Sequence, residues 1–70
     1  ADDAQIAAMV KLNLWDDPEV KGWQIKVSSV RAIVTLEGRV PSEYARDKAI
    51  RIAKETGSVV GVEDRLSIVN

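Results

Sequence analysis

One stretch constrains the fold more than any other: residues 32–55, AIVTLEGRVPSEYARDKAIRIAKE. Its first part has the period-2 pattern of a strand with one buried face, carried by Val34, Leu36, Gly38 and Val40. Pro41 ends the strand, because proline has no N–H to donate to a neighbouring strand. Ser42 can then accept a hydrogen bond from the first free amides of a helix. The pattern therefore predicts a strand, a sharp corner and a helix in immediate succession.

The predicted helix carries a narrow stripe of mostly small residues at helical spacing, formed by Ala45, Ala49, Ile52 and Ala53. Small side chains allow a helix to lie close to a sheet. Gly38 favours the same arrangement, since a glycine within a strand often marks a bulge or a close backbone approach. The centre of this protein is thus predicted to be a helix lying across a sheet.

The residues before this centre predict a helix and a strand. Asp2 or Asp3 can cap a first helix over about 4–14, which ends before Pro18. Four apolar residues are predicted to form its buried face: Ile6, Met9, Val10 and Leu14. The alternation of Trp23, Ile25 and Val27 predicts a half-buried strand with Trp23 in the core.

Two turns complete the outline. A hairpin turn is expected at 29–32, although Arg31-Ala32 supplies neither of the residues, glycine and asparagine, that tight hairpins favour at positive φ. Thr56-Gly57-Ser58 predicts the end of the second helix. A last strand is expected over about 62–69. Alternate positions of this segment, which share one face of a strand, are occupied by Val60, Val62, Asp64, Leu66 and Ile68.

The predicted order is helix, strand, strand, helix, strand. The first two strands form an antiparallel hairpin, and the last arrives through a right-handed helical crossover and pairs in parallel. Seventy residues can fill only one core, so both helices must cover the same face. The fold class is α+β: a two-layer αββαβ sandwich with a three-stranded mixed sheet and two helices on one face.

Composition excludes several functions. The formal net charge of −1 provides no general field for nucleic acid, so no nucleic-acid partner is expected. The chain has no histidine and no cysteine, and its serines therefore lack an imidazole to activate them. The adjacent acids Asp2-Asp3, Asp16-Asp17 and Glu63-Asp64 lack the spacing of a calcium loop. We expect neither catalysis nor a metal site nor a cofactor.

The chain resembles the BON domain family, named for bacterial osmotically inducible and nodulation proteins. The resemblance covers nearly the whole chain, and its most specific part is Val34-Thr35-Leu36-x-Gly38-x-Val40 followed by the helix. Other matching positions are Asp3, Ile6, Val10, Leu14, the 15–18 corner, Ile25, Val27, Ser42, Arg46, Ala49, Ile52, Ala53, Val59, Val62, Asp64 and Leu66. The chain departs from the family at Ala32 and Ser58, where glycine is common.

The resemblance implies a periplasmic or envelope-associated role, often in osmotic or envelope stress protection, and attachment to anionic phospholipid surfaces. It also implies a neighbouring BON unit or another domain in the same protein. Residues 1–70 are therefore expected to be a single domain of a longer protein.

A lipid-binding surface is predicted on the second helix, where Tyr44, Lys48 and Arg51 form a stripe flanked by Lys54. Each basic side chain near an anionic leaflet contributes about 1 kcal/mol, so such binding is weak. The alternative is a solvated face on which Asp47, Arg51 and Glu55 form ion pairs within the helix.

The alternative function is protein assembly. Leu12 and Trp15 stand off the predicted core face of the first helix, and Val30 occupies a hairpin position where a polar residue is expected. These residues, or an outer strand of the sheet, can dock a sister domain or another partner.

Overall fold

The computed structural model describes residues 2–18, 20 and 24–69. It contains α1 (Asp3–Trp15), β1 (Ile25–Val30), β2 (Ile33–Val40), α2 (Glu43–Glu55) and β3 (Gly61–Ile68). Each predicted element is present: the first helix, expected over about 4–14, spans 3–15, and the last strand, expected over about 62–69, spans 61–68. The predicted core position of Trp23 lies outside the described residues.

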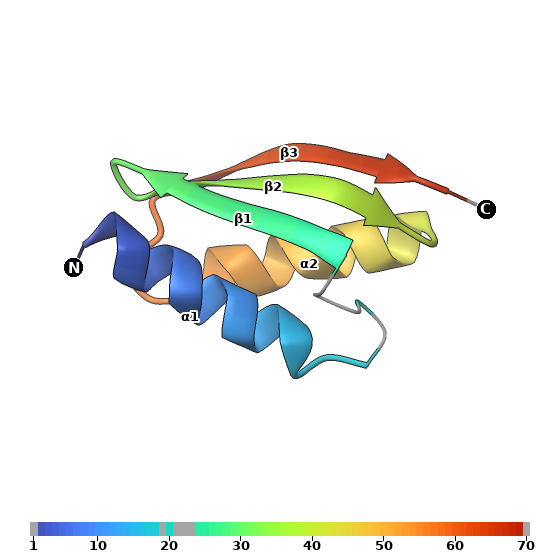
Figure 1. Cartoon of the computed structure of the whole chain (residues 1–70), viewed down its shortest axis with the longest axis horizontal. Helices are drawn as coiled ribbons and strands as arrows, with labels where there is room; N and C mark the ends of the chain where they lie inside the picture. The colour runs from blue at the N-terminus through green and yellow to red at the C-terminus, as the bar shows by residue number, and fades with distance from the viewer. Residues whose placement is uncertain (1, 19, 21–23, 70) are drawn as a thin grey trace.

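The sheet has the order β1-β2-β3. β1 and β2 are antiparallel, and β2 and β3 are parallel, with Ile33 opposite Gly61 and Val40 opposite Ile68. Both helices lie on one face of the sheet (Figure 1). The predicted two-layer α+β sandwich with a mixed sheet is therefore confirmed.

The core lies between the helix layer and the sheet. It is formed by Ile6, Val10 and Leu14 of α1, Val20, Ile25 of β1, Val34, Leu36 and Val40 of β2, and Ala45, Ala49 and Ala53 of α2. The alanines of α2 keep this helix close to the sheet, as the sequence predicts. Val20 is 1% exposed, although it lies between α1 and β1 rather than within either element.

Gly38 allows the close backbone approach that its position in a strand predicts. Its φ is +138°, and a Cβ added there would lie 2.3 Å from the backbone oxygen of Gln24. Any other residue would meet rigid backbone rather than a flexible side chain.

The β1–β2 hairpin closes through Arg31 and Ala32, whose φ angles are +54° and +65°. Two consecutive residues at positive φ are typical of a type I′ turn, in which non-glycine residues are strained. Asp3 stabilises this turn. Its carboxylate accepts hydrogen bonds from the Arg31 amide (3.1 Å), the Ala32 amide (3.0 Å) and the Ser29 hydroxyl (3.0 Å). Asp3, which is distant in sequence, thus stabilises a turn that lacks the glycine or asparagine usually found at positive φ.

The two aspartates that could cap α1 have separate roles. Asp2 is the N-cap and accepts from the Ala4 amide at 2.9 Å. Asp3 binds the hairpin. The amides of Ala32 and Arg31 and the hydroxyl of Ser29 all hold the pKa of Asp3 below its ordinary value.

One expectation about burial is wrong, and two further features were not predicted. Met9 is 43% exposed, since α1 buries a narrower stripe than its many apolar residues allow. Val60 is 80% exposed because it precedes β3. After α2, the left-handed conformation belongs to Ser58 (φ +73°), one of the two positions where the chain departs from a common glycine.

Candidate binding surface

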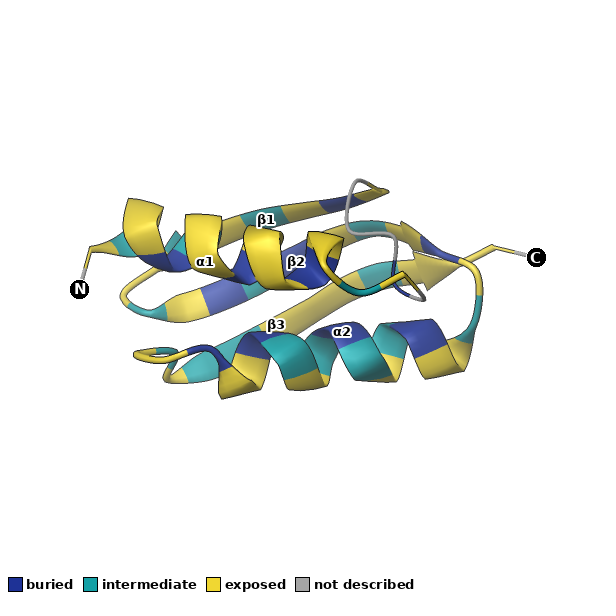
Figure 2. Cartoon of the chain, turned by 90° about the horizontal axis from the view of Figure 1, so that it is seen from below, coloured by how far each residue is buried: buried dark blue, intermediate teal, exposed yellow. Residues whose placement is uncertain are grey.

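The sequence singles out two groups of helical residues, one on α1 and one on α2. Both groups lie on the outer surface of the helix layer. We define the helix layer as α1, the following turn at 16–18, and α2. Positions two residues from a buried residue point away from the sheet, because a helix turns by about 100° per residue. Leu12 of α1 and Arg51 of α2 are such positions. Figure 2 views this surface and shows the exposed outer side of α1 beside α2.

The outer face of α1 is apolar. Leu12 is 60% exposed, Trp15 53% and Met9 43%. The ammonium of Lys11 lies 5.6 Å from the centroid of the Trp15 ring, within the range of a cation–π interaction. Leu12 and Trp15 thus form an exposed ridge bordered by one cation, which we call the α1 ridge. Its exposure agrees with the sequence, which places both residues off the core face.

The predicted lipid-binding residues of α2 gather only in part. Tyr44, Lys48 and Arg51 line a shallow hollow of about 170 Å³ together with Asp47. The Lys48 ammonium lies 5.8 Å from the Tyr44 ring centroid. Lys54 is exposed but does not line this hollow. The structure therefore brings three of the four residues together and adds an acidic one.

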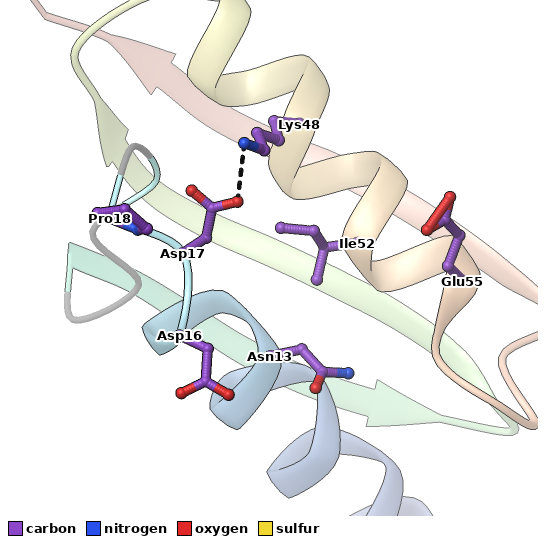
Figure 3. Close-up of a pocket in the computed structure, with 7 residues that line it drawn as sticks. All are labelled: Asn13, Asp16, Asp17, Pro18, Lys48, Ile52 and Glu55. Carbon is purple, nitrogen blue, oxygen red and sulfur yellow. Dashed lines mark ion pairs between the residues drawn. The ribbon is translucent and has the colours of Figure 1, made fainter.

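Lys48 also forms an ion pair that the sequence does not predict. Its Nζ lies 3.0 Å from Oδ2 of Asp17, whose side chain is only 15% exposed. The pair joins α2 to the turn after α1 and crosses a groove of about 500 Å³ (Figure 3). The groove is lined by Asn13, Asp16, Asp17, Pro18, Lys48, Ile52 and Glu55.

A hydrogen bond also links α1 to the end of α2 beside this groove. The side-chain amide of Asn13 donates to the hydroxyl of Thr56 at 3.1 Å, and that hydroxyl donates to the carbonyl oxygen of Ile52 at 3.0 Å. Thr56 is buried. A polar residue within an apolar helical stripe, such as Asn13, was the available signal for this contact.

The charges of the helix layer nearly cancel. α2 has four basic residues, Arg46, Lys48, Arg51 and Lys54, and three acidic ones, Glu43, Asp47 and Glu55. Asp16 and Asp17 add two acids at the groove. Among the described residues, Arg51 forms no ion pair with Asp47 or Glu55, contrary to the expected solvated-face pairs, and Asp47 instead contacts Arg46 at 3.5 Å. Electrostatic attraction to an anionic surface is consequently weak.

Val30 lies at the other end of the molecule from Trp15. It ends β1 beside the hairpin that Asp3 holds at the start of α1, and it is 66% exposed. Its partner across the strands is Ile33, and at the same turn the Val60 amide donates to the Ala32 oxygen at 2.8 Å. Both are exposed, and neither was predicted as a site residue. The structure thus separates Val30 from the α1 ridge.

Within residues 2–18, 20 and 24–69, no three acidic side chains lie close enough together to hold a metal ion. Over the same described residues, neither helix has the length and hydrophobicity needed to cross a bilayer.

Comparison with known proteins gives a consistent family. The family model described as BON domain matches residues 2–70. Osmotically-inducible protein Y of Escherichia coli (strain K12) is 36% identical over 67 residues, which cover 96% of this chain. The chain spans about a third of the length of that curated relative. Together with the αββαβ sandwich described above, these matches show that the chain belongs to the BON domain family.

Proposed function

We propose that this domain is a non-catalytic module that attaches to phospholipid surfaces of a bacterial envelope and serves protection against osmotic stress. The osmotic role follows from the name of the relative, osmotically-inducible protein Y, and from family membership. The same resemblance supports an envelope location, including the periplasm.

The observation that carries attachment is the composition of the helix layer. Leu12 and Trp15 are each more than half exposed on α1. Tyr44, Arg51 and Lys54 stand on the outer side of the neighbouring helix. Tryptophan and tyrosine favour the headgroup level of a bilayer, and basic stems favour anionic headgroups above them. The α1 ridge supplies the apolar part and α2 the cationic part.

The balance of charges makes the two helices contribute unequally to the affinity for phospholipid. Because acidic residues offset the bases of α2, and Lys48 is paired with Asp17, insertion of the α1 ridge contributes most of the affinity. Arg51 and Lys54 then contribute about 1 kcal/mol each at low salt, and less at physiological salt.

The test is sedimentation of the 70-residue chain with anionic and neutral phospholipid vesicles at low and physiological salt. Leu12→Ser with Trp15→Ser should reduce binding to anionic vesicles at least about tenfold at both salt concentrations. Arg51→Gln with Lys54→Gln should reduce it by up to about thirtyfold at low salt, the equivalent of about 2 kcal/mol, and by much less at physiological salt. The matched control is Val30→Ser, which removes an equally exposed apolar residue from the far end of the molecule. Absence of binding to either vesicle would refute attachment.

A second candidate function is protein assembly through the same α1 ridge. Its support is the apolar character of that ridge, since contiguous exposed apolar surface marks association sites. In this case light scattering without lipid should reveal association that survives high salt and is lost with Trp15→Ser, and the vesicle experiment should give no binding.

A further inference from the structure

The helix layer is wider than the sheet that it covers. Two packed helices, each about 10 Å across, cover roughly 20 Å, whereas three strands about 4.8 Å apart occupy only about 14 Å. α2 packs on β3 and β2, and in Figure 2 it follows the outer border of the molecule beyond β3. α2 therefore overhangs the free edge of β3, and the difference in width is about that of one strand.

The space beneath this overhang is bordered by apolar side chains that are only partly covered. Ile50 of α2 and Val62 and Leu66 of β3 pack against the core but remain half-buried. Ile68, near the end of β3, is 40% exposed. Because alternate residues share one face of a strand, Val62, Leu66 and Ile68 all lie on the helix-covered face. A further strand beside β3 would cover these side chains on both elements.

The free edge of β3 presents hydrogen-bonding groups for such a strand. The Val69 amide donates to the Val40 oxygen, so amides of odd-numbered residues face β2 and those of even-numbered residues face outward. β3 contains no proline to interrupt this series. The outward amide of Leu66 is bound by the carboxylate of Asp64 at 2.9 Å. This contact is local and exposed, so another strand can replace it.

A cluster of charged side chains lies between α2 and the middle of β3, and we call it the Arg46 cluster. The guanidinium of Arg46 lies 3.4 Å from Glu43, 3.5 Å from Asp47 and 3.8 Å from Asp64. Its Nε atom is buried and has no hydrogen-bond partner among the described residues, which is unfavourable. Three carboxylates surround one guanidinium, so the cluster has an excess of negative charge.

We propose that the edge of β3 binds an extended segment of a partner protein as a fourth, antiparallel strand beneath α2. The side chains of this segment that face the helix layer are apolar, except for one lysine or arginine opposite Asp64. The apolar side chains lie opposite Val62 and Leu66, where Ile50 of α2 covers them. Main-chain hydrogen bonds supply the affinity of such strand addition, and the alternate side chains supply its specificity.

The overhang and the charge define this partner. A second copy of the chain would bring its own helix layer onto the face where α2 already lies, so only a segment without a covering helix fits. The negative excess of the Arg46 cluster favours a basic side chain opposite Asp64, because opposite charges attract across neighbouring strands. An acidic side chain at this position would add a fourth carboxylate to the cluster.

Binding of the segment also provides the acceptor that Arg46 lacks. A backbone carbonyl of the segment accepts from the Leu66 amide, which releases the Asp64 carboxylate. That carboxylate, now 3.8 Å from Nε of Arg46, can then accept from it. The basic side chain of the segment offsets the negative charge that remains. A local hydrogen bond is thus exchanged for a set in which the buried Nε atom is also satisfied.

The first test measures the binding of two synthetic peptides to the 70-residue chain by calorimetry. The peptide acetyl-SVTKTVS-amide places its lysine opposite Asp64 and its valines opposite Val62 and Leu66, and acetyl-SVTETVS-amide differs only by a glutamate. The lysine peptide should saturate the chain at millimolar concentration or below, with at least about fivefold higher affinity than the glutamate peptide. Methylation of both valine amides should abolish binding, because these amides donate to β3. No saturation by the lysine peptide, or equal affinity of the two peptides, would overturn the proposal.

The second test locates the bound peptide by nuclear magnetic resonance of the isotope-labelled chain. The lysine peptide should shift the Nε–H signal of Arg46 and the outward amides of β3, which are those of Val62, Asp64, Leu66 and Ile68. Signals of β1, the other edge strand, should move less. Largest shifts on β1 or on α1 would refute binding at the edge of β3.

A charge reversal then tests how the basic residue is recognised. Asp64→Lys leaves the Arg46 cluster without an excess of negative charge and should remove the preference for the lysine peptide. The matched control is Asp16→Lys, the same change at an exposed aspartate after α1, which should leave the preference intact. A preference that persists in Asp64→Lys would contradict recognition by the cluster.

None of these experiments uses lipid, and Asp64 lies outside the α1 ridge and the basic side of α2. The inference consequently stands or falls separately from the proposed phospholipid attachment.

Discussion

α1 and α2 have the same length, 13 residues, and cover the same face of the same sheet, yet their outer sides are opposites. α2 buries alanines and turns charged side chains outward. α1 buries Ile6, Val10 and Leu14 but also exposes Leu12 and Trp15. Helices that are apolar on all sides are normally buried on all sides. The difference indicates that the charged outer side of α2 is suited to contact with solvent, whereas the apolar outer side of α1 is suited to a partner.

The helices also differ in how they hold the sheet. α2 achieves contact through small side chains that permit a close approach. α1 uses larger side chains and one polar anchor, Asp3, which reaches the hairpin. Each of the following predictions alters one side of this comparison.

The largest expected effect distinguishes the buried side of α1 from its outer side. Leu14→Ala should lower the free energy of unfolding by about 2–5 kcal/mol, because Leu14 is fully buried and a cavity would remain. Leu12→Ala, the same change on the outer side, should alter it by no more than about 0.5 kcal/mol. Urea denaturation measures both. Equal effects would mean that the outer side of α1 contributes to the core.

A smaller loss of stability is expected from a larger side chain at the position where α2 lies close to the sheet. Ala49→Leu should destabilise the fold by about 1–3 kcal/mol, since Ala49 has no exposed surface and the larger side chain must push the helix from the sheet. Ala8→Leu, at an exposed position of α1, is its matched control and should be nearly neutral. Thermal unfolding of the two variants gives the comparison directly.

Asp3→Ala should lower the melting temperature near neutral pH by releasing three hydrogen bonds to the hairpin. The folded pKa of Asp3 lies below the ordinary value of 3.8. Its contribution is therefore fully present above that value and is lost as the pH falls through the folded pKa. The gap between the two proteins should be constant above about pH 4 and should close in stronger acid. A gap that widens in acid would contradict this assignment.

The ion pair between the helices should contribute less. A double-mutant cycle of Asp17→Asn and Lys48→Gln should give a coupling of up to about 1 kcal/mol, because both side chains are only partly exposed and salt screens the pair. Urea denaturation at low and high salt is the measurement. A coupling that does not decrease at high salt would assign the interaction to packing.

The smallest effect on stability is expected from the exposed aromatic residues of the two helices. Trp15→Ser and Tyr44→Ser should each change the free energy of unfolding by about 0.5 kcal/mol or less, since each side chain is more than half exposed. A marked loss of stability with Trp15→Ser would identify this residue as part of the core and remove the basis for the α1 ridge.

Local patterns were sufficient for most of the fold. Ser42 does cap α2, accepting from the Ala45 amide at 3.1 Å, and Gly38 does mark a close backbone approach. Both depend on neighbours in sequence or on the period of one strand. The parallel pairing of β3 follows from chain order and the handedness of the crossover.

Contacts between distant residues were not predictable in this way. Nothing near Arg31 and Ala32 indicates that Asp3 binds their amides, and nothing near Lys48 points to Asp17 rather than to an acid on its own helix. Met9 was placed in the core because α1 offers more apolar residues than one helical face can bury. The apolar residues of α1 that exceed one buried face are the signal for the α1 ridge.

The arrangement of the chain ends determines how this domain responds to tension. The start of α1 and the end of β3 lie at opposite ends of the molecule, whose longest dimension is 36 Å (Figure 1). A pull on both therefore runs parallel to β3 and to the β2 strand beside it. The hydrogen bonds between these parallel strands are loaded in shear, but the other end of the pull acts on α1, which is held to the sheet by side-chain packing and by the contacts of Asp3. Under tension α1 should therefore detach before β3 separates from β2.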